Sequence, residues 1–257
     1  IFKIPFSWMT NKTFGLVGCL FPMSNDGYFS DDLVQSEIES VKSKSAKNIV
    51  WAPNNDYKFE LIIPHTVYPP REDTDLMAKR IISLGSGQGK NFLEIGSGSG
   101  ALSILASSLG YNVHCCDINP FAVSATIGNL KLNHHNAVVK EGGVGPEEFP
   151  FDGKFDLIIW NLPYIKSSDI NDFLGPMEDA ALVDTDKIGL DARLVRRIFS
   201  NQLLTKEGRV LILGRKKDLS NSYELAHRIW DRLTFEDGEE IVICCLWIPF
   251  SRADVSF

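Results

Sequence analysis

The sequence predicts an α/β fold: a seven-stranded mixed sheet, mostly parallel with a C-terminal antiparallel hairpin, preceded by a small N-terminal α+β extension. Three observations support this fold class. From residue 72 onward, short apolar runs alternate with segments of helical periodicity, as in a parallel sheet covered by helices. The last two apolar runs flank Asp237-Gly238, a pair typical of a hairpin turn. Before residue 66 the alternation is absent, and aromatic residues are frequent.

The N-terminal extension is expected to hold one helix and one hairpin. Apolar side chains recur at helical spacing across residues 31–43, behind Ser30 as the capping residue. The apolar runs 47–52 and 57–63 are joined by Pro-Asn-Asn-Asp, which predicts a hairpin. Residues 65–73 include two prolines that hold the residues before them in extended conformation, so we expect a linker there.

The chain after the linker is expected to alternate between helices and strands. One helix begins at Asn119 and Pro120, which suit the cap and the first helical position. We expect helices at residues 72–85, 96–110, 119–133, 191–204 and 221–232. We expect strands at residues 91–95, 111–117, 137–141, 155–161 and 209–214, followed by a hairpin over residues 233–250. Ligands of such sheets bind beyond the carboxyl ends of the strands.

The composition limits the function classes. The chain has 257 residues with 26 Lys and Arg against 33 Asp and Glu, a net charge of −7 that argues against broad polyanion binding. The sequence has no apolar run long enough to span a membrane, and its first residues lack the layout of a signal peptide. We therefore expect a cytoplasmic protein. The five cysteines are Cys19, Cys115, Cys116, Cys244 and Cys245. They lack zinc-ligand spacing, so we expect buried thiols in a reducing compartment and no metal site.

A glycine-rich turn follows the strand at 91–95. Glu94 precedes a Gly-Ser-Gly-Ser-Gly turn that opens a helix, and the next strand ends in Asp117. Glycines let a backbone approach a ligand closely, and a carboxylate in that position can accept ribose hydroxyls. An acid directly before the glycines repels a pyrophosphate but suits a cation. The pattern therefore indicates a nucleoside cofactor with positive charge, such as S-adenosylmethionine.

Residues 92–133 resemble the cofactor-binding half of class I methyltransferases, which have a Rossmann-like sheet. The resemblance implies that Asp117 binds the ribose, that Ile118 packs on the adenine, and that Glu141 contacts the adenine amine. It places the remaining cofactor residues near the methionine portion: Glu94, Gly96, Ser97, Gly98 and Gly100.

The strand at 155–161 ends in Asn161-Leu162-Pro163-Tyr164, which looks like the Asn-Pro-Pro-Tyr signature of amino methyltransferases. These enzymes act on planar or weakly basic nitrogens. The Asn161 oxygen and the carbonyl of Leu162 can accept the two hydrogens of such a nitrogen, and Tyr164 offers a flat face. The resemblance makes these four residues catalytic, with Asn161 also beside the cofactor and Tyr164 also beside the substrate. Leu162 stands where the family has proline.

Residues 67–76 are similar to the segment that precedes the catalytic domain in the HemK/PrmC-type glutamine methyltransferases. By this resemblance Pro70, Arg71 and Glu72 line the substrate site, and Thr74 lies against the cofactor. It implies a substrate-recognition extension over residues 1–66 and a class I methyltransferase catalytic domain over residues 67–257. The first 57 residues do not match the helical N-terminal domain usual in that family.

Three functions stay open at this stage. The first is methylation of a protein glutamine, in the Gly-Gly-Gln motif of a peptide-chain release factor. The second is methylation of a nucleic-acid amine such as adenine, with N-terminal aromatic residues stacking on bases. The third is a non-catalytic, cofactor-binding scaffold, which the Leu162 substitution permits. A protein substrate is favoured over nucleic acid, and the need for an activating partner subunit stays open.

Overall fold

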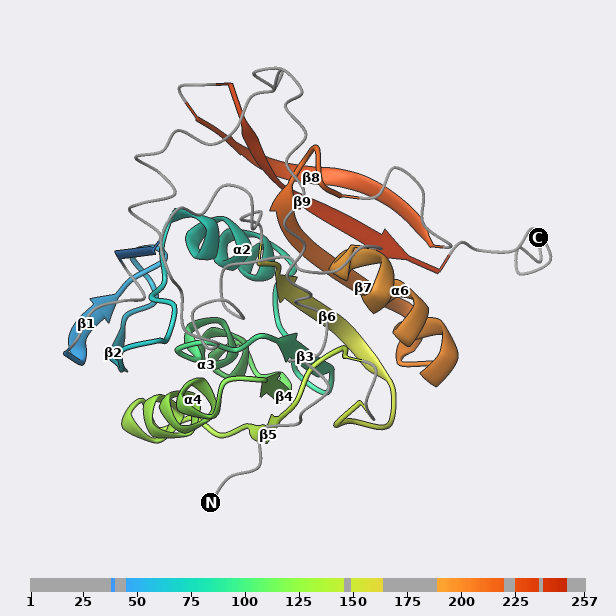
Figure 1. The fold of residues 1–257 in the computed structure, drawn as a ribbon. Helices are drawn as coiled ribbons and strands as arrows, with labels where there is room; N and C mark the ends of the chain where they lie inside the picture. Colours follow the sequence, from blue (N-terminus) through green and yellow to red (C-terminus); the bar gives the residue numbers. More distant parts are fainter. Residues whose placement is uncertain are drawn as a thin grey trace, which may run out of the picture.

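The computed structural model describes residues 38–39, 45–145, 149–163, 189–219, 225–235 and 238–248. Its main feature is a seven-stranded sheet of order β5-β4-β3-β6-β7-β9-β8 (Figure 1). The strands are β3 (Asn91–Ile95), β4 (Asn112–Asp117), β5 (Val138–Glu141), β6 (Phe155–Asn161), β7 (Leu204–Arg215), β8 (Ala226–Thr234) and β9 (Glu240–Trp247). The five strands β3 to β7 pair in parallel, and β9 pairs antiparallel with both β7 and β8. The predicted fold class is confirmed.

Helices cover both faces of this sheet. Helices α2 (Glu72–Ser83), α3 (Ala101–Ser108) and α4 (Pro120–Leu132) pack on one face, and α6 (Leu190–Asn201) packs on the other (Figure 1). Successive side chains of a strand point to opposite faces. Accordingly, Phe92 belongs to the core beneath α2 to α4, whereas its neighbour Leu93 belongs to the core beneath α6. The near-continuous apolar runs of the central strands reflect burial on both faces.

The predicted start of α4 is confirmed. Asn119 has extended backbone dihedrals, its Oδ1 accepts the N–H of Phe121 at 2.9 Å, and Pro120 is the first helical residue. Helix α6 ends at Asn201 rather than Leu204, because Gln202 adopts a left-handed conformation with φ of 52°. The chain then turns at once into β7.

The predicted helix over residues 221–232 is wrong in the part that the structure describes. Residues 226–234 form β8, which pairs along the length of β9. Strand β9 pairs with β7 along one edge and with β8 along the other, so its backbone groups have partners on both sides. A register shift between Ile229 and Asp231 interrupts the alternation of side chains along β8. The sequence of β8 therefore lacks the regular two-residue period that would have predicted a strand.

The hairpin of β1 (Lys47–Trp51) and β2 (Phe59–Ile63) forms as predicted, in an antiparallel register that pairs Trp51 with Phe59. Its inward side chains, including Leu61, join the core shared by α2, α3 and α4. None of the described helices is long and apolar enough to cross a membrane. The helix expected over residues 31–43 lies mostly outside the described residues. The two described residues of this range, 38 and 39, are helical.

Candidate functional site

The glycine-rich turn lies at the carboxyl end of β3 and folds over the end of β4. Gly96, Gly98 and Gly100 have φ of 69°, 53° and 81°, a region that L side chains rarely adopt. The N–H of Gly96 donates to the carbonyl of Cys116 at 2.8 Å, and the N–H of Ser97 donates to the same carbonyl at 3.1 Å. A Cβ on Gly100 would lie 3.0 Å from the Cα of Thr126, so glycine is also required for the contact with α4.

Asp117 is the last residue of β4, and its carboxylate holds the glycine-rich turn in place through hydrogen bonds. Its Oδ2 accepts the N–H of Gly98 at 2.8 Å, and its Oδ1 accepts the N–H of Asn119 at 2.9 Å. Burial raises the pKa of Asp117, and these backbone donors oppose the rise. Each carboxylate oxygen has two lone pairs, so Asp117 retains acceptor capacity for a pair of hydroxyl groups.

Glu94 is the residue before the last in β3, two positions before Gly96, and its side chain is buried. The Ser103 hydroxyl, from the first turn of α3, donates to its carboxylate. Burial raises the pKa of Glu94 to about 8, and the nearby Asp117 adds to the rise. A cationic ligand group beside Glu94 would favour the charged form of this carboxyl group and so lower its pKa.

The two residues expected to contact the adenine, Ile118 and Glu141, differ in solvent exposure. The methyl Cγ2 of Ile118 lies 3.0 Å from the place of a Cβ on Gly143, so Ile118 packs against the chain that follows β5. Glu141, at the end of β5, pairs in register with Asp117, but its side chain is exposed. Ile118 is thus partly buried beside Gly143, whereas Glu141 is exposed at the end of β5.

The segment before α2 reaches the glycine turn. The carbonyl of Tyr68 lies 3.6 Å from the place of a Cβ on Gly98. Asn119 Nδ2 donates to the carbonyl of Thr66 at 2.8 Å, so the residue that caps α4 also anchors this segment. Tyr68, within the segment 67–76, therefore lies against the glycine-rich turn.

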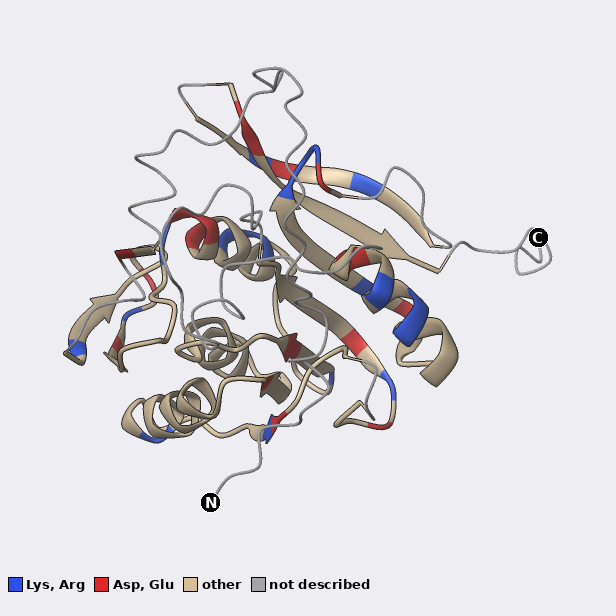
Figure 2. Cartoon of the chain, in the orientation of Figure 1, with Lys and Arg blue, Asp and Glu red and all other residues tan. Residues whose placement is uncertain are grey.

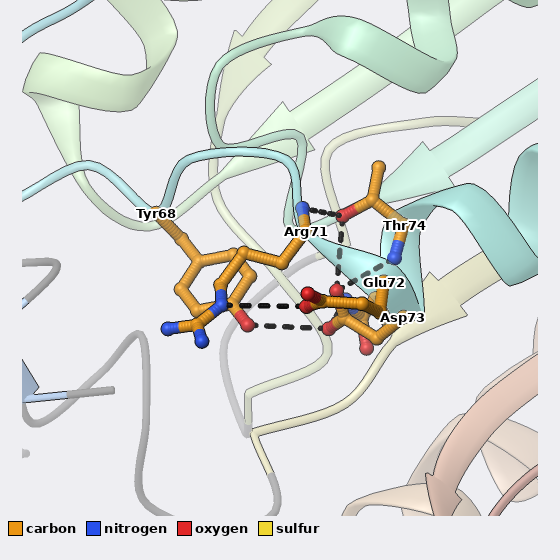
Figure 3. Close-up of polar contacts among 6 residues, drawn as sticks. Tyr68, Arg71, Glu72, Asp73 and Thr74 are labelled. Carbon is orange, nitrogen blue, oxygen red and sulfur yellow. Dashed lines mark hydrogen bonds and ion pairs between the residues drawn. The ribbon is translucent and has the colours of Figure 1, made fainter. Parts of the chain in front are cut away.

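The predicted residues Arg71, Glu72 and Thr74 lie close together at the start of α2 (Figure 3). Arg71 and Glu72 face one another at the surface, with the Nε and Oε2 atoms 3.7 Å apart, and the Glu72 side chain is 76% exposed. Thr74 is buried, and its Oγ1 accepts the N–H of Arg71 at 3.3 Å. Pro70 is half-buried.

Sequence reasoning missed Asp73, which lies at the centre of this group (Figure 3). Asp73 is only 3% exposed, and its Oδ1 accepts the N–H of Thr74 at 2.6 Å. Its Oδ2 accepts Nδ2 of Asn161 at 2.7 Å and the hydroxyl of Tyr68 at 3.4 Å. Acids in the first turn of a helix are usually solvated and interact with the helix dipole, so the sequence alone offered no reason to single out this one.

Asn161 ends β6 beside the glycine turn. Its Nδ2 is engaged by Asp73, whereas its Oδ1 is buried and has no hydrogen-bond partner among the described residues. Buried polar atoms are nearly always paired, so an orphaned acceptor at this sheet end indicates a binding site for a donor. The N–H of Leu162 continues the pairing of β6 by donating to the carbonyl of Leu213 at 2.9 Å. Pro163 is half-buried, and Tyr164 falls outside the described residues.

Among the described residues, no cluster of three His, Cys, Asp or Glu side chains forms a candidate metal site. Cys115, Cys116, Cys244 and Cys245 are buried thiols, and burial raises the pKa of each. Cys19 lies outside the described part.

Comparisons with known proteins find methyltransferases among the proteins similar to this chain. Residues 74–164 match the family model of ribosomal protein L11 methyltransferase. A protein of Methanocaldococcus jannaschii named as a protein N5-glutamine methyltransferase is 36% identical over 104 residues, which are 40% of this chain and 50% of that protein. The release factor glutamine methyltransferase of Aliivibrio fischeri is 31% identical over 115 residues, which are 44% of this chain and 40% of that protein. The chain thus spans half or less of the length of these relatives.

The solved tRNA m1G37 methyltransferase of M. jannaschii superposes with a TM-score of 0.54 at 16% identity, covering 79% of this chain and 55% of that one. The strand order and this likeness give the chain the class I methyltransferase fold, and the sequence matches relate it to methyltransferases. S-adenosylmethionine is the cofactor of this class.

Proposed function

We propose that this chain transfers a methyl group from S-adenosylmethionine to the side-chain amide nitrogen of a protein glutamine, in the Gly-Gly-Gln motif of a peptide-chain release factor. One observation carries the proposal. Asn161 presents a buried Oδ1, without a hydrogen-bond partner among the described residues, at the end of β6, next to the strand that leads into the glycine turn. A planar N–H donor fits this acceptor.

The cofactor would occupy the carboxyl ends of β3 and β4. Asp117 would accept the ribose hydroxyls, and Ile118 would contact one face of the adenine. The backbone of residues 96–100 and the carboxyl group of Glu94 would face the methionine portion. A buried carboxylate is a favourable partner for the positive charge of the cofactor, because a low dielectric strengthens their attraction.

The chemistry requires orientation more than a strong base. The lone pair of an amide nitrogen is delocalised, so the amide is a poor nucleophile. Asn161 Oδ1 and the carbonyl of Leu162 would each accept one N–H and direct the remaining orbital of the nitrogen at the methyl carbon. The nitrogen–carbon bond forms while the carbon–sulfur bond breaks, and the pair of electrons of that bond stays on the sulfur. The positive charge moves to the nitrogen, which then loses a proton to water.

Glutamine is favoured over other planar nitrogens by the relatives and by the segment at 67–76. The two relatives described above are named for glutamine methylation, whereas the matching family model is named for ribosomal protein L11. Basic and acidic residues are interspersed over the described elements, which gives no broad basic surface of the kind that nucleic acids bind (Figure 2). The arginines of α6 are a local exception: Arg193, Arg196 and Arg197. A second candidate, methylation of a nucleic-acid amine, draws support from the same planar-nitrogen chemistry at Asn161 and from a relative named as a tRNA (guanine(37)-N(1))-methyltransferase, which is 33% identical over 109 residues.

The test incubates the chain with methyl-labelled S-adenosylmethionine and a purified release factor carrying Gly-Gly-Gln. The matched control is the same release factor with Gly-Gly-Glu, because a carboxylate has no N–H to donate. We expect label on the first protein and none on the second. Label in RNA, and not in either protein, would refute the glutamine proposal and favour the second candidate. Cofactor binding without transfer, with or without a cell extract that supplies a partner subunit, would indicate a scaffold.

A further inference from the structure

Asp73 is a buried carboxylate with a specific arrangement of donors. Its Oδ1 accepts the N–H of Thr74 at 2.6 Å and the hydroxyl of Thr74 at 3.2 Å. Its Oδ2 accepts Nδ2 of Asn161 at 2.7 Å, across 88 residues of sequence. Thr74 therefore fixes the carboxylate at the start of α2 (Figure 3). The carboxylate in turn fixes Asn161 at the end of β6.

The contact determines which end of the Asn161 amide faces Asp73. An ionised carboxylate only accepts hydrogen bonds, so it must face the NH2 end of the amide. A half-turn of the Asn161 amide would bring two acceptors together and would direct NH2 away from Asp73. In the observed orientation the opposite end, Oδ1, is the buried acceptor that lacks a partner among the described residues.

We infer that Asp73 is a positioning residue that holds Asn161 with its oxygen toward the substrate nitrogen, and so makes the site select a nitrogen that carries hydrogen. The inference rests on the proposed function, since it assigns a cause to the orientation of the catalytic amide. Asp73 acts through Asn161 and takes no proton from the substrate.

The arrangement also has an electrostatic consequence. Methyl transfer moves a positive charge from the sulfur to the substrate nitrogen. A carboxylate that accepts a hydrogen bond from the NH2 end of an amide polarises the amide, so the amide oxygen becomes a stronger acceptor. The chain of hydrogen bonds from Asp73 through Asn161 therefore stabilises the nitrogen more in the transition state than in the free amide.

The test compares four variants with the wild-type chain: Asp73→Asn, Asn161→Asp, the double exchange Asp73→Asn with Asn161→Asp, and the control Asp75→Asn. In Asp73→Asn, Asn161 can turn, and we expect kcat to fall about 10- to 100-fold with little change in the dissociation constant of S-adenosylmethionine. Asn161→Asp places two carboxylates in contact and should be at least as impaired. Asp75, two residues along α2, accepts Trp51 Nε1 at 2.7 Å and should tolerate the same change.

The double exchange separates positioning from mere structural support. The amide introduced at position 73 can donate to the carboxylate introduced at position 161, and the second oxygen of that carboxylate then faces the substrate as the acceptor. We expect the double exchange to be about tenfold more active than Asp73→Asn alone. A structural role would instead make it as poor as, or worse than, the two single changes combined.

A spectroscopic measurement tests the hydrogen bond without turnover. The side-chain amide protons of Asn161, assigned by their loss in Asn161→Asp, should shift upfield in Asp73→Asn and stay unchanged in Asp75→Asn. Unchanged protons, a wild-type kcat in Asp73→Asn, or an inactive double exchange would each overturn the inference. An inactive wild-type chain would refute the proposed function instead, so the two failures are distinguishable.

Discussion

The side chain of Asn129 on α4 pairs with both backbone groups of Ile62 on β2, as a neighbouring strand would. Asn129 Oδ1 accepts the N–H of Ile62 at 2.8 Å, and Nδ2 donates to its carbonyl at 3.0 Å. Asn133 repeats the arrangement one turn later with Glu60, at 3.0 Å and 2.7 Å. Residues four apart on a helix rise about 6 Å and residues two apart on a strand about 6.8 Å, so the two spacings nearly coincide.

This relationship predicts that Asn129 anchors the hairpin. Asn129→Ala removes both bonds to Ile62 and the bond from Nδ2 to the carbonyl of Ser99 at 2.9 Å in the glycine turn. We expect the free energy of unfolding to fall by about 1–3 kcal/mol, with faster hydrogen exchange at the Ile62 amide. Asn112→Ala, at an exposed asparagine, is the control. Unchanged exchange at Ile62 would contradict the prediction.

The alternation of strands and helices was predictable because strands buried on both faces appear in the sequence as short apolar runs. The glycine turn was predictable because its backbone conformation favours glycine, and Asp117 because it ends the strand next along the chain. Strand β8 was missed because its bulge breaks the alternation. Asp73 and Asn129 were missed because a polar residue on a helix is usually solvated, and only the tertiary fold brings each to its partner.

Leu162 stands where the resembled family has proline, and its N–H is in use. That N–H donates to the Leu213 carbonyl at 2.9 Å, and the side chain is buried against the backbone of Gly214. Leu162→Pro loses the bond and part of the packing but keeps the carbonyl proposed to accept a substrate N–H. We expect the free energy of unfolding to fall by about 2–4 kcal/mol, measured by urea denaturation, with kcat largely retained. A variant more stable than the wild type would show that the N–H contributes nothing.

Glu94 predicts a pH dependence of both stability and cofactor binding. Burial raises the pKa of Glu94 to about 8 in the folded chain, above the ordinary value of 4.5. The folded state therefore binds more protons than the unfolded state between these values, so this contribution to stability is present below pH 4.5 and is lost as the pH rises through 8. Glu94→Gln should flatten that part of the stability curve, as followed by the thermal midpoint.

Binding of S-adenosylmethionine should follow the opposite slope, because a cation binds the ionised carboxylate better. We expect the dissociation constant to fall by up to about tenfold per pH unit up to pH 8 and then to level off. Calorimetry at several pH values measures it, and Glu94→Gln should remove the slope contributed by Glu94. Burial also raises the pKa of Asp117, so a slope that persists in Glu94→Gln would assign the effect to Asp117 instead.

Asn161 and Asp117 lie at the ends of β6 and β4, and their substitutions should separate catalysis from cofactor binding. Asn161→Ala removes the buried Oδ1 acceptor and leaves the glycine turn intact, so methyl transfer should fall at least about 100-fold while S-adenosylmethionine still binds. Asp117→Ala removes the acceptor of the Gly98 and Asn119 N–H groups, so the turn loosens and cofactor affinity should fall first. Titration of each variant with S-adenosylmethionine, followed by single-turnover transfer at saturating cofactor, distinguishes the two effects. If Asn161→Ala transferred methyl at the wild-type rate, the acceptor at the end of β6 would not be part of the reaction, and the substrate nitrogen would have to be oriented by other groups.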